Sequence, residues 1–435
     1  MKAIETGFCK RVSKFSALMF IDNLLFDAVS ENTKSLNAQA INTNGKYNVE
    51  ITKQGIDQRY TPSGVKFIQA LCVKVLQEQI NHSIESGWLS VFKRVLIKDS
   101  TKFDVSGNLA KQLPGSGGAA SKAGVCIQYE FDIKSEGVND LSIGSASSHD
   151  TSDTRATIGK VSKGDLIVRD LGYSIMSCFK TMNQEGAYFI SRLHPKTKVY
   201  EMKNNKLIEL DFVKLHKKMA KGNIVRLEKQ VIIGEKEKMP IRLIIELMPE
   251  EVTNKRLHET NKYNKKKGGT TSDNYKIKAR FNLFITNIEE TVLAPDVITK
   301  IYKLRWQVEL IFKIWKSIFG IDNNNPMKYE RLMCLLNARL LLILINWKLF
   351  MKKRWQLYET TGRLLSMTKC FKTLHEHGQE LRHILTDNCK KLTNWVGMVS
   401  KILESHHWLE KKKNKVGFIE IMTLNVLKSN KYDYL

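Results

Sequence analysis

The first 87 residues carry hydrophobic positions at helical spacing, without the alternation that strands produce. The segment TPSGVKFIQALCVKVLQEQINHSIESGW begins with turn-forming residues at 61–64. Apolar side chains then recur every three to five residues, at Val65, Ile68, Leu71, Val75 and Ile80. This period is typical of one face of an α-helix. We therefore expect residues 1–87 to form a helical N-terminal region.

From Trp88 onward, short apolar runs predict β-strands. The run VLIKDST reaches a carboxylate at Asp99. In VCIQYEFDIK, apolar and polar residues alternate strictly, which predicts a strand with one buried face. DLSIGSA predicts a third strand. In DLIVRDLGY an unbroken apolar triplet lies just before Asp170, a pattern typical of a strand buried on both faces. A helix over residues 174–184 and a strand over 187–191 are expected next.

The second half of the chain begins with strand-like pieces and ends in helices. KLIELDFV, NIVRLEKQVIIG and IRLIIELM precede the lysine-rich segment NKRLHETNKYNKKKGG. The strand RFNLFITNI then leads to a helix with Pro295 in its first turn and Gly320 just past its end, both favoured positions. Residues 326–435 are expected to be mostly helical.

The helix before Gly320 carries an unusual polar stripe. Tyr302, Arg305, Glu309 and Lys316 fall within an arc of about 60° on a regular helix. The stripe borders the apolar face rather than opposing it. One explanation is a surface ion pair between Arg305 and Glu309, worth a few tenths of a kcal/mol. The other is a functional site, in which these side chains face a cleft.

Three carboxylates from three separate elements favour the functional explanation. Asp99 and Asp170 each lie at the end of an apolar strand, and Glu309 lies on the helix. Hard divalent cations such as Mg²⁺ require oxygen ligands, and two such ions can act together in phosphoryl transfer. Because the chain has 44 acidic residues, the carboxylates alone are a weak signal.

At these positions the sequence resembles the bacterial insertion-sequence DDE transposases. YKLRWQVELIFKIWK contains the Tyr-x2-Arg-x3-Glu-x6-Lys (YREK) signature of that family, and IKDST and DLIVRDLGY are similar to its two aspartate blocks. Asp170 follows Asp99 by 71 residues, and Glu309 follows Asp170 by 139. The longer gap is similar to that of members with a β-rich insertion. The resemblance covers about residues 50–320.

The resemblance implies an α/β fold: an RNase H-like mixed sheet with flanking helices, similar to the retroviral integrase core. Its parts would be a helical DNA-binding region (1–87), the first part of the core (88–195), a β-rich insertion (196–279), the second part of the core with the glutamate helix (280–325), and a helical region suited to dimerisation (326–435). Asp99, Asp170 and Glu309 would be the catalytic metal ligands. Tyr302, Arg305 and Lys316 would bind DNA.

The implied reaction is cut-and-paste DNA transposition. It requires Mg²⁺, with Mn²⁺ as a substitute and two ions expected, and transfers a freed 3′-hydroxyl to target DNA. The partners would be the terminal inverted repeats, the target duplex and a second copy of the chain in a synaptic complex. Two alternatives stay open: an RNase H-like nuclease or resolvase without strand transfer, and a non-catalytic DNA-binding protein derived from a transposase. The second is disfavoured because all three carboxylates are present.

Composition agrees with a nucleic-acid partner. Lys and Arg total 70 against 44 Asp and Glu, a net charge of +26, which favours a polyanion. No signal peptide is expected at the start of the chain, and the apolar run at 332–350 is interrupted by Asn337 and Arg339, so it predicts a buried helix. Seven scattered cysteines suit a reducing cytoplasm. We expect a cytoplasmic, nucleoid-associated bacterial protein that does not contact a membrane.

Three further features have less specific interpretations. Trp306 adjoins the stripe and is expected to pack in the core, with stacking on a displaced base as the alternative. His149 and Asp150 are expected to cap a helix or form a turn, with a role beside the site as the alternative. YNKKKGG is either a phosphate-binding segment or a solvated loop.

Overall fold

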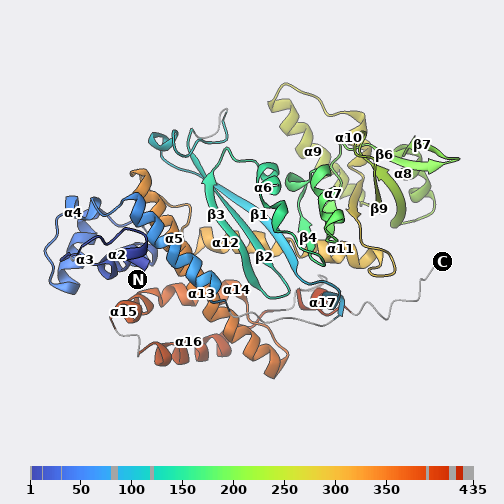
Figure 1. The fold of residues 1–435 in the computed structure, drawn as a ribbon. Coiled ribbons are helices and arrows are strands. Elements are labelled where there is room, and N and C mark those ends of the chain that lie inside the picture. The colour runs from blue at the N-terminus through green and yellow to red at the C-terminus, as the bar shows by residue number, and fades with distance from the viewer. Residues whose placement is uncertain are drawn as a thin grey trace.

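The computed structural model (Figure 1) describes residues 2–11, 13–30, 32–79, 87–117, 122–387, 391–410 and 418–424. Within these residues, ten strands form one sheet in the order β3-β2-β1-β4-β5-β10-β9-β8-β6-β7. Successive residues of a strand point to opposite faces, and β1 accordingly contributes Leu96 to one hydrophobic core and Ile97 to the other. The central strands are therefore buried on both sides, whereas the outermost strand β7 (Lys206–Glu209) has no buried residue.

The first five strands have an RNase H-like arrangement. β1 (Val95–Asp104), β2 (Gly124–Asp132) and β3 (Gly137–Ser145) form an antiparallel meander, whereas β4 (Leu166–Arg169) and β5 (Tyr188–Arg192) are added parallel to β1. The parallel crossovers contain α6 (Asp150–Thr157) and α7 (Met176–Gln184). The predicted mixed sheet with flanking helices is confirmed.

The expectation of one buried face for β2 is wrong, because all nine of its residues are buried. Its polar side chains have partners from other elements. Glu130 accepts a hydrogen bond from Arg169, and Gln128 accepts one from Tyr173. Polar groups can be buried when such partners satisfy them, and these partners lie 39 and 45 residues away in the chain.

The strands of residues 196–279 extend the same sheet. β10 (Phe281–Thr286) pairs with both β5 and β9 (Met239–Leu247), followed outward by β8 (Arg226–Ile233), β6 (Val199–Lys203) and β7 (Lys206–Glu209). This part also contains three helices: α8 (Phe212–Lys221), α9 (Glu250–Lys266) and α10 (Asp273–Lys278). Most of YNKKKGG forms the last turn of α9, so the loop interpretation is wrong for that part.

The N-terminal region is helical, as predicted. It contains α1 (Lys2–Glu5), α2 (Ala17–Ala28), α3 (Leu36–Tyr47), α4 (Lys53–Asp57) and α5 (Pro62–Gln77). The hydroxyl of Thr61 accepts a hydrogen bond from the Gly64 backbone N–H at 3.1 Å, which caps α5. Ile80 lies outside the described residues.

The C-terminal region is also helical. It contains α13 (Tyr329–Thr361), α14 (Met367–Glu376), α15 (Gly378–Asp387), α16 (Leu392–His406) and α17 (Phe418–Met422). By length and composition α13 could cross a membrane, but 83% of its most apolar window is buried inside the protein. It lies against α5 (Figure 1), and is the buried helix expected. The lysine-rich segment KKKNK at 411–415 lies outside the described residues.

The single helix predicted before Gly320 is in fact two, α11 (Pro295–Lys303) and α12 (Trp306–Ser317). Between them, Leu304 donates to the Ile301 carbonyl and Arg305 to the Tyr302 carbonyl. These i→i−3 bonds tighten the chain locally, as in a 3₁₀ turn. The predicted 60° stripe therefore does not lie on one straight helix.

Candidate active site

The pairing of β1 with β4 brings Asp99 and Asp170 together. The two strands are parallel and pair in register up to Lys98 opposite Arg169, and Asp99 and Asp170 are the next residues along the chain. Asp170 directly follows β4, as expected. The expectation that Asp99 ends a strand is wrong, because β1 continues to pair with β2 as far as Asp104. The side chain of Asp99 remains 21% exposed, which leaves this edge accessible to a ligand.

Arg305 joins Glu309 to this pair of aspartates. Its Nη1 donates to Asp99 Oδ2 at 3.1 Å, and its Nη2 lies 2.7 Å from Glu309 Oε1. The arginine side chain is 11% exposed. The Arg305–Glu309 ion pair thus exists, but it is not an isolated surface pair because the same guanidinium reaches a second carboxylate on β1.

Tyr302 binds the remaining carboxylate. Its hydroxyl donates to Asp170 Oδ1 at 2.9 Å, and its ring packs edge-on against Phe284 with centroids 5.0 Å apart. Burial raises the pKa of Tyr302, and the negative charge of Asp170 raises it further. The hydroxyl therefore stays protonated and can act as a donor at neutral pH.

Lys316 lies apart from the carboxylates. Its Nζ donates to the Lys102 carbonyl at 3.2 Å, and it follows Glu309 by two helical turns, about 10 Å along α12. The structure therefore brings five of the six predicted site residues into two neighbouring sets of contacts, Arg305 with Asp99 and Glu309, and Tyr302 with Asp170. The sixth, Lys316, lies farther along α12, beside Lys102 of β1.

The pKa of Asp99 is raised mainly by burial. The Ser100 N–H and Arg305 lower this pKa, the nearby charges of Asp170 and Glu309 add smaller increases, and the net result is a pKa of about 6. Three carboxylates near one another repel unless a cation lies between them. In this structure that cation is the Arg305 guanidinium.

The residues fit a divalent cation by chemistry, since they are carboxylate oxygens in a partly buried site. Nevertheless, the described residues contain no group of three or more His, Cys, Asp or Glu side chains arranged to hold a metal ion. Arg305 contacts two of the three carboxylates instead. The guanidinium contacts one oxygen of each, Asp99 Oδ2 and Glu309 Oε1.

Other predicted features have mixed outcomes. Trp306 is 64% exposed, so the core-packing interpretation is wrong: its position at the start of α12 turns it away from the core. His149 and Asp150 lie at the start of α6, as the capping interpretation predicted, although the His149 side chain makes no capping hydrogen bond. Lys98, directly before Asp99 on β1, is a further charged residue at the site and is fully buried. A charged residue inside the apolar run VLIKDST was the available signal.

Two aspartates at neighbouring positions of adjacent parallel strands and a glutamate from a following helix, on an RNase H-like sheet, define the DDE class of enzymes. Comparison with known proteins identifies the family. Residues 90–345 match the family described as "Transposase DDE domain". The chain belongs to this family and is an enzyme of the DDE transposase type.

Individual relatives agree with the family. The chain is 29% identical over 381 residues to the transposase for insertion sequence element IS231F of Bacillus thuringiensis subsp. israelensis, covering 83% of this chain and 80% of the relative. It is 28% identical over 394 residues to the transposase for IS1151 of Clostridium perfringens, covering 87% and 83%. A piggyBac transposase synaptic complex with hairpin DNA is similar with a TM-score of 0.46 and 10% identity, covering 96% of this chain and 83% of that one.

Proposed function

We propose that this protein is the transposase of an insertion sequence of the YREK type, which binds the ends of the element, cleaves DNA there and transfers the freed 3′-hydroxyl to target DNA. The observation that carries the proposal is the gathering of three carboxylates at one place: Asp99 and Glu309 share Arg305, and Asp170, beside Asp99 on the paired strand, is held by Tyr302. The names of the relatives, which are transposases for insertion sequence elements, support it.

In this proposal Asp99, Asp170 and Glu309 hold Mg²⁺, two ions being expected and Mn²⁺ serving as a substitute. The bound ions would activate the attacking oxygen and stabilise charge on the leaving oxygen. The protein's own part is to present three carboxylates from β1, the end of β4 and α12 at one place. The pKa of Asp99 is raised first by burial and then by the charges of Asp170 and Glu309, and a bound cation would offset both effects.

Tyr302, Arg305 and Lys316 are proposed to bind the DNA strand beside the cleavage site. A guanidinium can bind phosphate oxygens as it binds carboxylates, so Arg305 could exchange Asp99 or Glu309 for a phosphate. Tyr302 would hold Asp170 in place and contact the strand. Lys316, about two helical turns away, suits a phosphate farther along the backbone.

The proposed division of labour follows the chain. Residues 1–87 would recognise the element ends, since a site that binds phosphates and metal carries little base specificity. Residues 88–195 and 280–325 would form the catalytic core, and 196–279 the insertion. Residues 326–435 would contribute to a homodimer that holds two DNA ends. Such a protein acts in the bacterial cytoplasm on nucleoid DNA, and its charge of +26 suits that partner.

The test uses the full chain with duplex DNA carrying the ends of the element. With Mg²⁺ we expect nicks at the element ends and, with a second labelled duplex, joining of the new 3′-end to it. Nicks without joining would support the nuclease alternative. End binding without nicks in either Mg²⁺ or Mn²⁺ would support the non-catalytic alternative.

A further inference from the structure

The sheet has a second polar layer on the face away from α12. Asp99 reaches Arg305 at the α11–α12 junction, so its neighbours on β1, Lys98 and Ser100, point to the opposite face. That face is covered by α6. Both neighbours of Asp99 make their polar contacts there with aspartates of α6.

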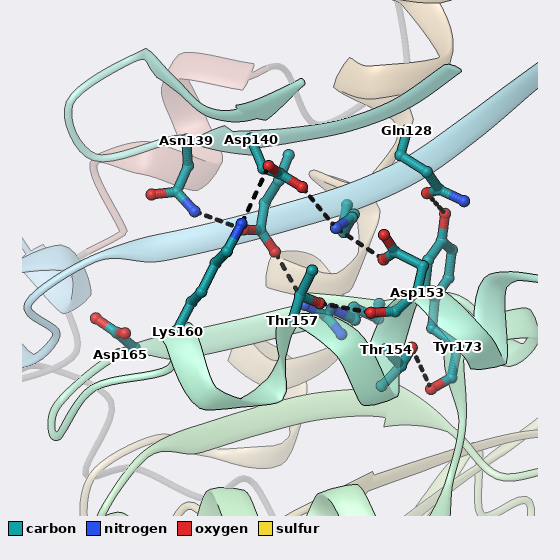
Figure 2. Close-up of polar contacts among 12 residues, drawn as sticks. Gln128, Asn139, Asp140, Asp153, Thr154, Thr157, Lys160, Asp165 and Tyr173 are labelled. Atoms are coloured by element: carbon teal, nitrogen blue, oxygen red, sulfur yellow. Dashed lines mark hydrogen bonds and ion pairs between the residues drawn. The ribbon is translucent and has the colours of Figure 1, made fainter. Parts of the chain in front are cut away.

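Lys98 is held by an ion pair with α6. Its Nζ lies 2.7 Å from Asp153 Oδ2 and 3.0 Å from Asp140 Oδ2 on β3, and the lysine side chain is 0% exposed. Figure 2 shows the carboxylates of Asp140, on β3, and Asp153, on α6, directed toward each other. A buried ammonium is strongly destabilising without such partners. The position of Lys98 is therefore tightly determined.

Ser100 is held by the same helix, one turn earlier. Its Oγ donates to Asp150 Oδ1 at 2.9 Å, and Gln128 Nε2 donates to the same oxygen at 3.1 Å. Gln128 in turn accepts a hydrogen bond from the Tyr173 hydroxyl at 2.8 Å (Figure 2). Ser100, the residue directly after Asp99, is thus held by a chain of hydrogen bonds that also includes Asp150, Gln128 and Tyr173.

The spacing of the contacts matches the two elements. Lys98 and Ser100 are two residues apart on a strand, about 7 Å, and Asp150 and Asp153 are three apart on a helix, about one turn. One turn of α6 therefore contacts β1 on both sides of Asp99. The same helix reaches the segment after Asp170, where Thr154 Oγ1 donates to the Tyr173 carbonyl at 3.4 Å (Figure 2).

We infer that α6 positions the carboxylate of Asp99 for its cation. Asp150 and Asp153 fix β1 from the far face of the sheet, so that Asp99 is presented in one orientation without touching either residue. The inference rests on the proposed function, in which Asp99 is a metal ligand. Residues that orient a ligand in this way commonly change metal affinity by about 10–100-fold when replaced.

The experiment measures the affinity for Mn²⁺ alone, from the electron paramagnetic resonance signal of free Mn²⁺, on folded full-length protein. Asp150→Leu removes the acceptor and should weaken Mn²⁺ binding about tenfold or more. Ser100→Ala removes the same hydrogen bond with little change in volume, and should weaken binding in the same direction. Asp150→Asn keeps an acceptor oxygen and should bind Mn²⁺ like the wild type.

Arg94→Met is the matched control. It breaks the ion pair between Arg94 and the buried Asp165, next to the opposite end of β4, so it should lower the melting temperature without changing Mn²⁺ affinity. The positioning role is overturned if folded Asp150→Leu and Ser100→Ala bind Mn²⁺ like the wild type. It is also overturned if Asp150→Asn is as weak as Asp150→Leu, or if Arg94→Met weakens binding equally.

Asp99→Asn separates this inference from the proposed function. If that variant binds Mn²⁺ as the wild type does, Asp99 is not a metal ligand and the proposed function loses its basis. If Asp99→Asn loses Mn²⁺ while the Asp150 and Ser100 variants retain it, the proposed function stands and only the positioning role of α6 fails.

Discussion

At the scale of single residues, Arg305 is the most informative side chain of the site. It contacts Asp99 and Glu309 at once. It therefore offsets the repulsion between carboxylates that would otherwise weaken the fold locally. The same charge is suited to a phosphate, so one residue can stabilise the free enzyme and contact its substrate at different stages.

Glu309→Gln should separate catalysis from binding. The change keeps the shape of the side chain and removes its charge, so end-nicking should fall to background while DNA binding persists or tightens. If Glu309 were only the ion-pair partner of Arg305, its replacement would lower stability by at most about 0.5 kcal/mol and leave nicking intact. Lys316→Ala is the counterpart: it should weaken binding of end DNA while leaving Mn²⁺ affinity unchanged. Gel-shift, nicking and Mn²⁺-binding assays on folded proteins decide between these outcomes.

The exposed Trp306 permits a second test at this scale. Trp306→Ala should leave the free energy of unfolding nearly unchanged, because the side chain is 64% exposed. Trp315→Ala, at a site 2% exposed, should lower it by about 3–5 kcal/mol. If Trp306 stacks on a displaced base, its replacement should also weaken binding to ends with unpaired bases by about 1–3 kcal/mol, and fully paired duplex much less. Equal loss on both DNAs would contradict stacking.

At the scale of elements, the sequence pattern predicted which segments form strands better than where the strands end or where helices break. The apolar run before Asp170 correctly placed this residue directly after a strand, because a buried strand appears as consecutive apolar residues. Asp99 instead lies within β1, which continues to Asp104 through its pairing with β2. The break between α11 and α12 was missed, since it depends on i→i−3 bonds at Leu304 and Arg305 and on a guanidinium contact with β1. The burial of the polar side chains of β2 was not predicted either, because their hydrogen-bond partners are distant in the chain.

The start of α5 gives an element-scale prediction. Thr61→Ala removes the acceptor for the Gly64 N–H and should lower the free energy of unfolding by about 1 kcal/mol. Thr61→Ser keeps the hydroxyl and should stay close to the wild type. Urea denaturation of the three proteins measures the difference. If serine were as destabilising as alanine, the methyl group rather than the cap would matter.

At the scale of the whole molecule, ion pairs join helices of the N-terminal region to helices of the C-terminal region. Asp22 on α2 pairs with Arg382 on α15 at 2.7 Å, and both side chains are almost fully buried. Arg339 on α13 pairs with Asp27 on α2 at 3.2 Å and donates to the Gly320 carbonyl just beyond α12. The N-terminal helices, the C-terminal helices and the end of the glutamate helix are thus held to one another.

The Asp22 pair predicts a pH dependence of stability. Burial alone would raise the pKa of Asp22, but hydrogen bonds from Arg382 and Lys46 outweigh it and the pKa is lowered. A lowered pKa means that the contribution is present above the unfolded value, about 3.9, and is lost as pH falls through the folded value. Asp22→Asn should therefore be less stable than the wild type by about 3–5 kcal/mol at pH 7.

Urea denaturation at pH 7, 5 and 3.5 gives the measurement. The difference between wild type and Asp22→Asn should be the same at pH 7 and 5, and smaller at pH 3.5. A difference that grows as the pH falls would contradict the assigned direction of the pKa shift. Asp165→Asn is the comparison, because Asp165 is also a buried aspartate paired with an arginine but lies within the core. It tests whether the loss of stability is specific to the contact between the N-terminal and C-terminal helices.

The net charge of +26 predicts strongly salt-dependent DNA binding. Each phosphate neutralised should contribute about −0.9 to the slope of log K against log salt concentration. Several contacts therefore give a steep negative slope between low and physiological salt, measurable by fluorescence anisotropy with a labelled duplex. A flat slope would count against nucleic acid as the main partner.

The pairing of β10 with β5 brings two segments that are far apart in the chain close together in space. The chain leaves the core after Arg192 and returns at Phe281, and Arg192 lies opposite Phe284 in adjacent strands. Entry and exit are thus neighbours, the arrangement that best tolerates gain or loss of residues between two points. Loops in the outer part of this segment can therefore lengthen or shorten over evolutionary time without displacing the catalytic centre. Its strand β9 cannot be exchanged as freely, because it pairs with β10 and shares a hydrophobic core with β1 and β4.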